Sequence, residues 1–302
     1  MPVELRQLRL IVAAANHRSL RQAAETLRVK QSTVSRTIRR VESRLGIQLF
    51  ERTNAGTRTT RAGAAFVDGA RIVVETADAI VQRAQAEAGG RGGRLFLGAH
   101  SSLSAGHLRA TLSALLEKAP EVDVRLLEGS RERLLVQVRA GLIDLAIVAG
   151  ERSISDLDGV PVWSDKIVAA VPRGHPLAER DTIYWTDLAA ETLILTSRDP
   201  GPQLEGHLLA KLASPDAMPR VVRHNVTHAT LAQLAGAGMG VALLCETSAE
   251  FGPHIRIKEV RDAAGPSGLV HTAYLRRGQR SPTLLALLRL LRERYPSRFW
   301  AT

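Results

Sequence analysis

Hydrophobic positions in the first sixty residues recur at helical spacing in three consecutive stretches. The first covers residues 4–16, and a shorter one begins at Leu20 and breaks after Leu27. The third runs from about residue 31 to residue 45, and Gly46 follows it as a common helix stop. Ser19 stands where it can cap the second helix. A short helix, a tight turn and a longer helix predict a helix-turn-helix motif.

The third stretch has an apolar stripe and an opposite polar, basic face. In helix-turn-helix proteins the second helix of the motif enters the major groove of DNA. Residues 47–50 can add a short strand, and residues 52–58 can form a basic hairpin wing. Amide, hydroxyl and guanidinium groups reach base edges and phosphates. We therefore predict DNA contacts from ten side chains: Ser19, Gln31, Ser32, Thr33, Ser35, Arg36, Arg39, Arg40, Arg52 and Arg58.

Residues 62–88 are rich in alanine and contain no proline, which predicts one long helix. At ~1.5 Å per residue it would be roughly 40 Å long. Large apolar residues recur every seven positions, with an alanine four residues after each, and this pattern is typical of helices that pair closely. We expect a parallel or antiparallel dimerisation helix, not one packed on its own domain. The seam consists of Phe66, Ala70, Val73, Ala77, Ile80 and Ala84, and glycines at 89–93 end the helix.

The remaining two thirds of the chain alternate apolar strand patterns with helical ones. This alternation predicts parallel βαβ units arranged as a two-lobed α/β module. The expected strands are 95–99, 122–127, 145–148, 167–171, 193–196, 221–223, 241–244 and 270–275, and the expected helices are 104–118, 131–140, 203–212, 228–237 and 282–295.

Positive charge is concentrated at one end of the chain. Of the formal net charge of +11 on 302 residues, residues 1–61 carry +9, from thirteen Lys and Arg against four Glu. The other 241 residues hold 28 basic against 26 acidic residues. Such a concentrated basic segment favours nucleic acid as a partner. A single cysteine excludes an intrachain disulfide, and we expect no membrane span and a cytoplasmic location.

Several motifs together resemble the LysR-type transcriptional regulators. In the first sixty-three residues they are LRQAAETL at 20–27, VSRTIRRVE at 34–42, LFER at 49–52 and TRAG at 60–63. Further along, residues 141–148, 175–177 and 237–244 look like landmarks of the same family. Two positions depart from the family pattern. Lys30 replaces the usual Ser or Thr, so we expect the helix cap at Gln31 or Ser32, and Cys245 replaces a usual proline.

The resemblance implies an all-α winged helix-turn-helix N-terminal domain, a linker helix, and an α/β two-subdomain effector domain of the periplasmic-binding-protein-like type. The corresponding boundaries are 1–61, 62–90 and 91–302. Within the last domain, lobe 1 would comprise about 91–162 and 268–302, and lobe 2 about 163–267. The resemblance also implies a homodimer or homotetramer that binds a two-fold related promoter site in double-stranded DNA.

Ligands of such α/β modules lie at the carboxyl ends of the strands. The loop after residue 99, the segment 196–199 and the crossover near 161–164 match parts that face the effector in the resembling family. Hydroxyls and helix N-termini suit an anion, so we expect a small organic acid or a phenolic compound. The predicted effector contacts are His100, Ser101, Ser102, Glu128, Thr196, Ser197 and Asn225.

Enzyme motifs are incomplete in this sequence. The glycines at 236–240 lack the third glycine and following helix of a dinucleotide loop, and His224 and His228 lack the other residues of a zinc site. No G-x-S-x-G is present. We predict no catalytic residues, cofactor or metal. Two alternatives stay open: an α/β solute-binding or enzymatic protein with an incidental basic N-terminus, and a regulator without a small-molecule effector.

Overall fold

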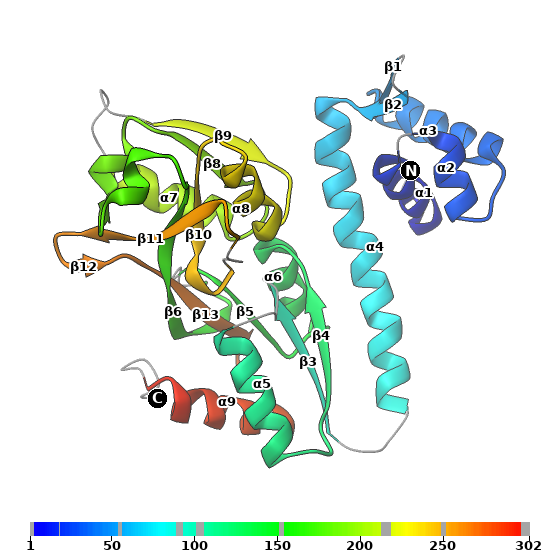
Figure 1. The fold of residues 1–302 in the computed structure, drawn as a ribbon. Coiled ribbons are helices and arrows are strands. Elements are labelled where there is room, and N and C mark those ends of the chain that lie inside the picture. Colours follow the sequence, from blue (N-terminus) through cyan, green and yellow to red (C-terminus); the bar gives the residue numbers. More distant parts are fainter. Residues whose placement is uncertain are drawn as a thin grey trace. The chain divides into compact units, whose positions relative to one another are not determined.

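The computed structural model describes residues 3–17, 19–53, 56–88, 93–100, 106–150, 154–212, 219–248 and 252–296. By its internal contacts the chain divides into two compact units, residues 1–90 and 91–302 (Figure 1). Each unit has its own hydrophobic core and is described by itself. No described helix is both long and apolar enough to cross a bilayer.

Three helices and a hairpin form the compact part of the first unit. The helices are α1 (Leu5–Asn16), α2 (Leu20–Thr26) and α3 (Gln31–Leu45), and the hairpin pairs β1 (Phe50–Thr53) with β2 (Gly56–Thr59). Apolar side chains of all three helices meet in one core, because each helix has its apolar residues on a single face. The core comprises Leu10, Ile11, Ala14, Leu20, Ala23, Ala24, Val34, Ile38, Val41, Leu49 and Val67.

The ends of α2 and α3 test the capping predictions. Ser19 caps α2, as predicted, by accepting a hydrogen bond from the Gln22 amide. Gly46 ends α3 with a φ of 68°, a left-handed conformation that glycine adopts without strain. The expected cap at Gln31 or Ser32 is wrong, because Lys30 itself is the N-cap residue and its side chain makes no capping bond. The start of α3 therefore leaves its first hydroxyls and amide exposed for other contacts.

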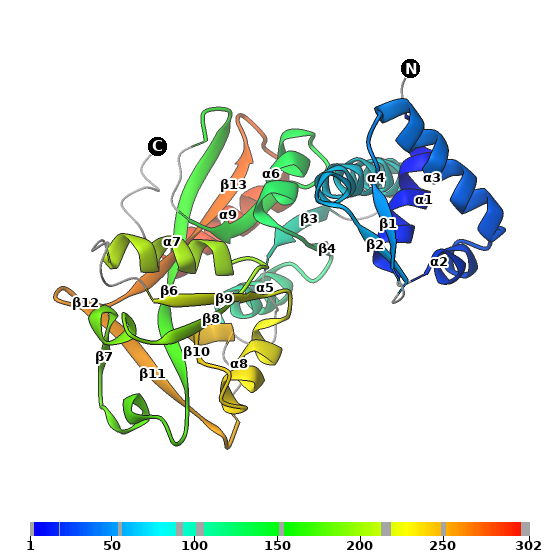
Figure 2. The same ribbon diagram turned by 90° about the horizontal axis from the view of Figure 1, so that it is seen from above.

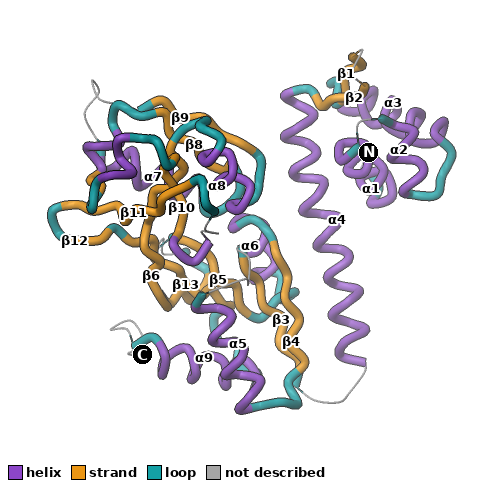
Figure 3. The backbone as a smooth tube through the Cα atoms, in the orientation of Figure 1, coloured by secondary structure: helices purple, strands orange, loops and turns teal. Residues whose placement is uncertain are grey.

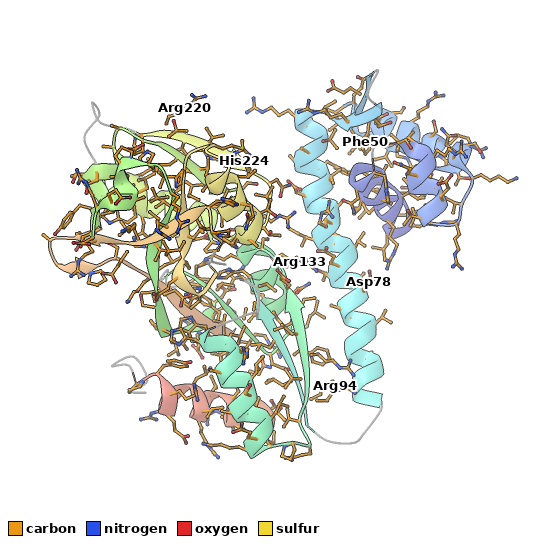
Figure 4. All side chains as sticks on the ribbon, viewed as in Figure 1. Phe50, Asp78, Arg94, Arg133, Arg220 and His224 are labelled. Atoms are coloured by element: carbon orange, nitrogen blue, oxygen red, sulfur yellow. The ribbon has the colours of Figure 1, made fainter. Side chains whose placement is uncertain are left out.

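Helix α4 (Arg61–Ala88) extends well beyond the compact part of the first unit (Figure 1). Its first half packs against α1, where Ala70 and Val74 are buried with Leu8. Asp78 of α4, labelled in Figure 4, also pairs with Arg9 of α1. The expectation that this helix does not pack on its own domain is therefore wrong for its first half.

The second unit is built on one mixed sheet whose main path has the order β4-β3-β5-β13-β6-β10-β8-β9. Figure 3 shows its strands with helices around them. Strands β11 and β12 and the short β7 lie off this path. Bounds of the strands are β3 Arg94–Ala99, β4 Asp123–Glu128, β5 Leu145–Ala149, β6 Leu157–Pro172, β7 Ile183–Tyr184, β8 Thr192–Thr196, β9 Arg220–His224, β10 Val241–Cys245, β11 Ile255–Asp262, β12 Gly265–Pro266 and β13 Gly268–Arg276.

Two lobes share this sheet, and each is covered by helices on both faces (Figure 2). In lobe 1, α5 and α9 pack on one face and α6 packs on the other. In lobe 2, α7 and α8 cover opposite faces. The helices are α5 His107–Lys118, α6 Arg131–Arg139, α7 Gly201–Lys211, α8 His228–Gly236 and α9 Pro282–Arg294, with 3-10 turns η1 Pro176–Glu179, η2 Trp185–Leu188 and η3 Glu246–Ser248.

The expected parallel βαβ units account for only part of the sheet. Strands β3, β4 and β5 are parallel, as are β8, β9 and β10, but β6 and β13 run antiparallel to their neighbours. Strand β6 is sixteen residues long and joins both lobes, whereas the sequence predicted only its end at 167–171. Its N-terminal half pairs with β13 and its C-terminal half with β10 and β11.

Candidate functional sites

One face of α3 is polar, exposed and basic. Val34, Ile38 and Val41 turn into the core, and this fixes the rotation of the helix. Gln31, Ser32, Arg36, Arg39 and Arg40 are then exposed, while Thr33 and Ser35 are half-buried. The Arg36 guanidinium donates only to the Ser32 carbonyl of its own helix, at 3.3 Å, in the described part of the chain. This face can offer guanidinium, amide and hydroxyl groups to a DNA groove.

The hairpin β1–β2 is tied to α3 by Glu42. Its carboxylate accepts hydrogen bonds from the amides of Leu49 and Phe50, at 2.8 and 3.1 Å. Figure 4 labels Phe50 where the hairpin begins. The position of Arg58, an exposed residue of β2, is thereby fixed relative to α3. The side chain of Arg52 lies outside the described residues.

Ser19, a predicted DNA contact, also caps α2 as the sequence predicted. Its hydroxyl accepts from the Gln22 amide at 3.2 Å and so holds the start of α2. The side chain is half-buried. A capping serine at a helix N-terminus can still present its hydroxyl and the free helix amides to a phosphate.

A cavity of about 630 Å³ lies between the lobes of the second unit. Lobe 1 contributes the end of β3, the end of β4 and the start of α6, and lobe 2 contributes the segment between β8 and α7. Carboxyl ends of parallel strands meet here, as expected for this architecture. The described lining is His100, Glu128, Gly129, Ser130, Glu132, Ser197, Arg198, Asp199 and Pro202.

Three of the seven predicted effector contacts line this cavity: His100, Glu128 and Ser197. Thr196 does not line it, because its hydroxyl donates to the Val226 carbonyl at 2.7 Å and accepts from the Arg198 amide. Asn225 lies behind Arg198 and accepts from its Nε at 2.9 Å. The predictions for Ser101 and Ser102 fall outside the described residues.

Asp199 bridges the two lobes. The sequence had indicated the segment 196–199 but had not singled out this residue. Its Oδ2 accepts from the Arg131 amide at the start of α6, at 2.6 Å. Its Oδ1 accepts from Gln203 Nε2 at 2.9 Å. A carboxylate at a helix N-terminus is stabilised by the free amides and by the helix dipole. The lobes are therefore held together across the cavity by a charge-assisted hydrogen bond.

His100, which lines the cavity, is the first of four rings stacked in a column. His271 of β13 stacks on His100, and Trp163 of β6 stacks on His271 with centroids 5.7 Å apart. His107 follows, stacked on Trp163 at 5.4 Å. Asp165 is the carboxylate beside the column, with its Oδ2 3.6 Å from His271 Nδ1. The four rings come from the residue after β3 and from β13, β6 and α5.

The buried histidines of this region favour the neutral form. Burial, together with the neighbouring imidazole of His271, lowers the pKa of His100 to about 3. Burial also lowers the pKa of His271, although the Asp165 carboxylate opposes that shift. For His228 of α8, burial and then the Arg198 guanidinium lower the pKa. At neutral pH these rings offer hydrogen bonds and no charge.

Cys245 at the end of β10 is a buried thiol, with 1% of its surface exposed. Burial raises the pKa of this thiol well above its ordinary value, and nearby Asp165 adds to the shift. Thiolates, not thiols, react with oxidants and disulfides. The side chain therefore packs in the lobe 2 core as a small apolar group.

Comparison with protein families gives two adjoining matches. Residues 5–64 match the model "Bacterial regulatory helix-turn-helix protein, lysR family", and residues 88–296 match the model "LysR substrate binding domain". The second match alone covers more than half of the chain. The chain belongs to the LysR family.

Its LysR relatives among curated proteins are named as regulators. A "Probable hydrogen peroxide-inducible genes activator" of Mycobacterium avium is 32% identical over 247 residues, which are 80% of this chain and 77% of that protein. The "DNA-binding transcriptional dual regulator OxyR" of Escherichia coli strain K12 is 29% identical over 248 residues, covering 80% and 79% of the two chains.

Solved LysR structures share the fold. The crystal structure of CbnR, a LysR family transcriptional regulator, matches with a TM-score of 0.63 and 23% identity over 98% of this chain and all of that one. Full-length CbnR in complex with its target DNA matches with a TM-score of 0.60 and 23% identity, over 96% and 99% of the two chains. The predicted family and fold class are thereby confirmed, and this protein is a LysR-type transcriptional regulator with a DNA-binding helix-turn-helix and an effector domain.

Proposed function

We propose that α3 is the helix that reads the promoter of this regulator. The observation that carries the proposal is the exposed leading face of α3, whose side chains remain available while the opposite face is buried in the core. Gln31, Ser32, Thr33, Ser35 and Arg36 stand nearest its N-terminal end and are assigned to base edges and adjacent phosphates. The phosphate contacts on either side are assigned to Ser19, Arg39, Arg40, Arg52 and Arg58.

Two experiments test this assignment. Selection of DNA from a random pool by the full-length protein should return sites with two-fold related half-sites, since a symmetric dimer presents two copies of α3. Binding to a selected site should weaken steeply as salt rises, because neutralised phosphates release counterions. A shallow salt dependence with no enriched sequence would contradict the proposal.

We further propose three functional parts, with boundaries at 1–61, 62–90 and 91–302, and the division of the chain into two units after residue 90 supports the second boundary. Helix α4 would serve as the self-association surface, as a homodimer or as a dimer of dimers. Val73 and Ile80 support this role, because they are 50% and 54% exposed, whereas Ala70 and Val74 of the same helix are buried with Leu8 of α1. Apolar side chains at this spacing are buried when a second helix packs against them. Such a regulator acts on the chromosome, and so in the cytoplasm, and carries out no catalysis of its own.

The inter-lobe cavity is proposed as the effector site, with lobe 1 at about 91–162 and 268–302 and lobe 2 at about 163–267. His100, Glu128 and Ser197 are contacts in this proposal, and Asn225 acts by orienting Arg198. Ser101 and Ser102 stay predicted contacts of the same site. A ligand that favours one separation of the lobes would shift the population of the regulator's states.

We also propose that this regulator does not respond to its signal by forming an intrachain disulfide. Its relatives in Mycobacterium avium and elsewhere are named peroxide-inducible activators. An intrachain disulfide needs two cysteines, and this chain has one. Burial keeps the Cys245 thiol protonated and shielded. Treatment of the protein with hydrogen peroxide should therefore leave its DNA affinity unchanged, and a peroxide-dependent change would contradict this part of the proposal.

A further inference from the structure

The side chains that line the inter-lobe cavity indicate the chemical class of its ligand. Apart from Gly129 and Pro202, every described lining residue has a polar or charged side chain. Pockets for aromatic or aliphatic ligands are lined mainly by apolar and aromatic side chains. The side chains of the described lining therefore offer a ligand mainly hydrogen bonds and charge.

Charge in the lining is predominantly negative. Glu128, Glu132 and Asp199 contribute three carboxylates, and Arg198 contributes one guanidinium. Asp199 is already engaged by the Arg131 amide and Gln203. The carboxylates of Glu128 and Glu132 have no hydrogen bond or ion pair with any described residue, and both side chains are exposed at the cavity. An anionic ligand would meet the carboxylates of Glu128 and Glu132 there.

His100 supplies a separate indication of a ligand. The residue is 7% exposed, it lines the cavity, and neither of its ring nitrogens has a hydrogen-bond partner within the described part of the chain. Buried polar atoms are nearly always hydrogen-bonded. A neutral imidazole has one donor and one acceptor nitrogen, so it matches a ligand hydroxyl, amide or amine. His100 and the two glutamates line the same cavity.

We propose that this cavity binds a small polar molecule carrying an ammonium group, with Glu128 and Glu132 facing the ammonium and His100 bonding a second polar atom. The inference rests on the proposed effector role of the cavity and names the chemical class of the effector. A zwitterion satisfies the site as well, because the Arg198 guanidinium offers a place for a carboxylate at the lobe 2 side. An acid without an amine leaves both glutamates unpaired.

A series of probes on one four-carbon skeleton isolates the effect of charge. Calorimetric titration of the full-length protein at pH 7.5 would compare 1,4-diaminobutane, 4-aminobutanoate and butanedioate at constant salt, with 1,4-butanediol as the neutral background. We expect both amines to bind at least about tenfold more tightly than butanedioate, since the carboxylates attract the ammonium and repel the diacid.

Two double variants test whether Glu128 and Glu132 cause the difference in affinity between the amines and butanedioate. The double variant Glu128→Gln/Glu132→Gln should weaken binding of 1,4-diaminobutane about tenfold or more and should not weaken butanedioate. Glu121→Gln/Glu179→Gln removes the same charge from exposed positions of the same unit outside the cavity, and it should change neither affinity. Loss of diamine binding in both double variants would mean that only the net charge of the unit matters.

The inference is overturned if butanedioate binds more tightly than the amines, if no amine binds, or if Glu128→Gln/Glu132→Gln leaves diamine affinity unchanged. Binding of a selected DNA site by the same preparation separates this failure from failure of the proposed function. Sequence-specific DNA binding without any amine binding overturns the ligand class alone. Absence of specific DNA binding overturns the regulator's proposed DNA-reading role, whatever the cavity binds.

Discussion

The imidazole of His100 stacks on the imidazole of His271, with ring centroids 5.3 Å apart and planes inclined by 14°. Both rings are buried, and β3 and β13 bring them together from opposite ends of the effector domain's sequence. Two neighbouring imidazoles cannot both be charged at low cost in such a place. Burial and this contact therefore favour the neutral form of His100 in the folded domain.

Acidification should destabilise the effector domain because His100 is buried and lies against His271. The folded state binds a proton at His100 only near pH 3, whereas the unfolded chain binds one near the ordinary histidine pKa of about 6.5. The stability that depends on neutral His100 is thus complete above about pH 6.5 and falls as pH drops below it. At pH 5.5 the loss should be roughly 1.4 kcal/mol for this residue. Urea unfolding at pH 7.5 and pH 5.5 measures it.

Substitutions separate His100 from the general effect of acid. His100→Gln cannot titrate, so the difference in unfolding free energy between the two pH values should shrink by about the same roughly 1.4 kcal/mol. His254→Gln, at an exposed position of the same unit, should leave the difference as in the unmodified protein. If His100→Gln keeps the full pH difference, then His271, His228 or the carboxylates carry it instead.

Removal of the Asp199 carboxylate should loosen the contact between the lobes. Asp199→Ala removes the acceptor of the half-buried Arg131 amide, and a charge-assisted hydrogen bond of this kind contributes about 1.5–3 kcal/mol. Hydrogen exchange should speed up at the start of α6 and in the segment before α7. Asp156→Ala breaks an exposed ion pair with Arg139 within lobe 1 and should have little effect on exchange at either place. Unchanged exchange in Asp199→Ala would show that the hydrogen bond between Asp199 and Arg131 does not hold the lobes together.

Charges on the exposed side of α4 should prevent self-association. Val73→Glu/Ile80→Glu places two carboxylates where apolar side chains are expected to meet a second helix, and their desolvation opposes pairing. Sedimentation should show a smaller species with unchanged helix content. Ala64→Glu, exposed on the opposite side of α4, is the control and should sediment like the unmodified protein. An unchanged mass in the double variant would place the association surface elsewhere.

Features with local causes could be predicted from the sequence. Helix α3 begins and ends at the expected residues, because Val34, Ile38 and Val41 recur at helical spacing and Gly46 provides the stop. The parallel strands β3, β5, β8 and β10 also have apolar runs, and these could be found. Strand β11 was missed since its alternation is interrupted by charged residues on a half-exposed edge, and β6 because Gly159 and Pro161 interrupt its pattern.

The effector cavity was harder to predict because it depends on long-range contacts. Thr196 and Ser197 are neighbours in sequence, yet only Ser197 lines the cavity, since the Val226 carbonyl draws the Thr196 hydroxyl away. Asp199 matters through the Arg131 amide, 68 residues away, and no local pattern reports such a pairing. The sequence pattern was enough to identify the segment 196–199, but only the tertiary structure shows which of its side chains line the cavity.

Arg36 provides the most direct test of base recognition by α3. Its exposed guanidinium stands one helical turn after Ser32, and in the groove it can form two hydrogen bonds with a guanine. Arg36→Ala should weaken binding to a selected site by about 1–3 kcal/mol and weaken binding to random DNA much less. Arg21→Ala on α2 removes the same charge from an exposed pair with Glu25 and is the control. Competition titrations with both DNAs at one salt concentration give the ratio. Equal losses on the two DNAs would show that Arg36 contacts phosphate and not a base, because a phosphate contact is blind to sequence.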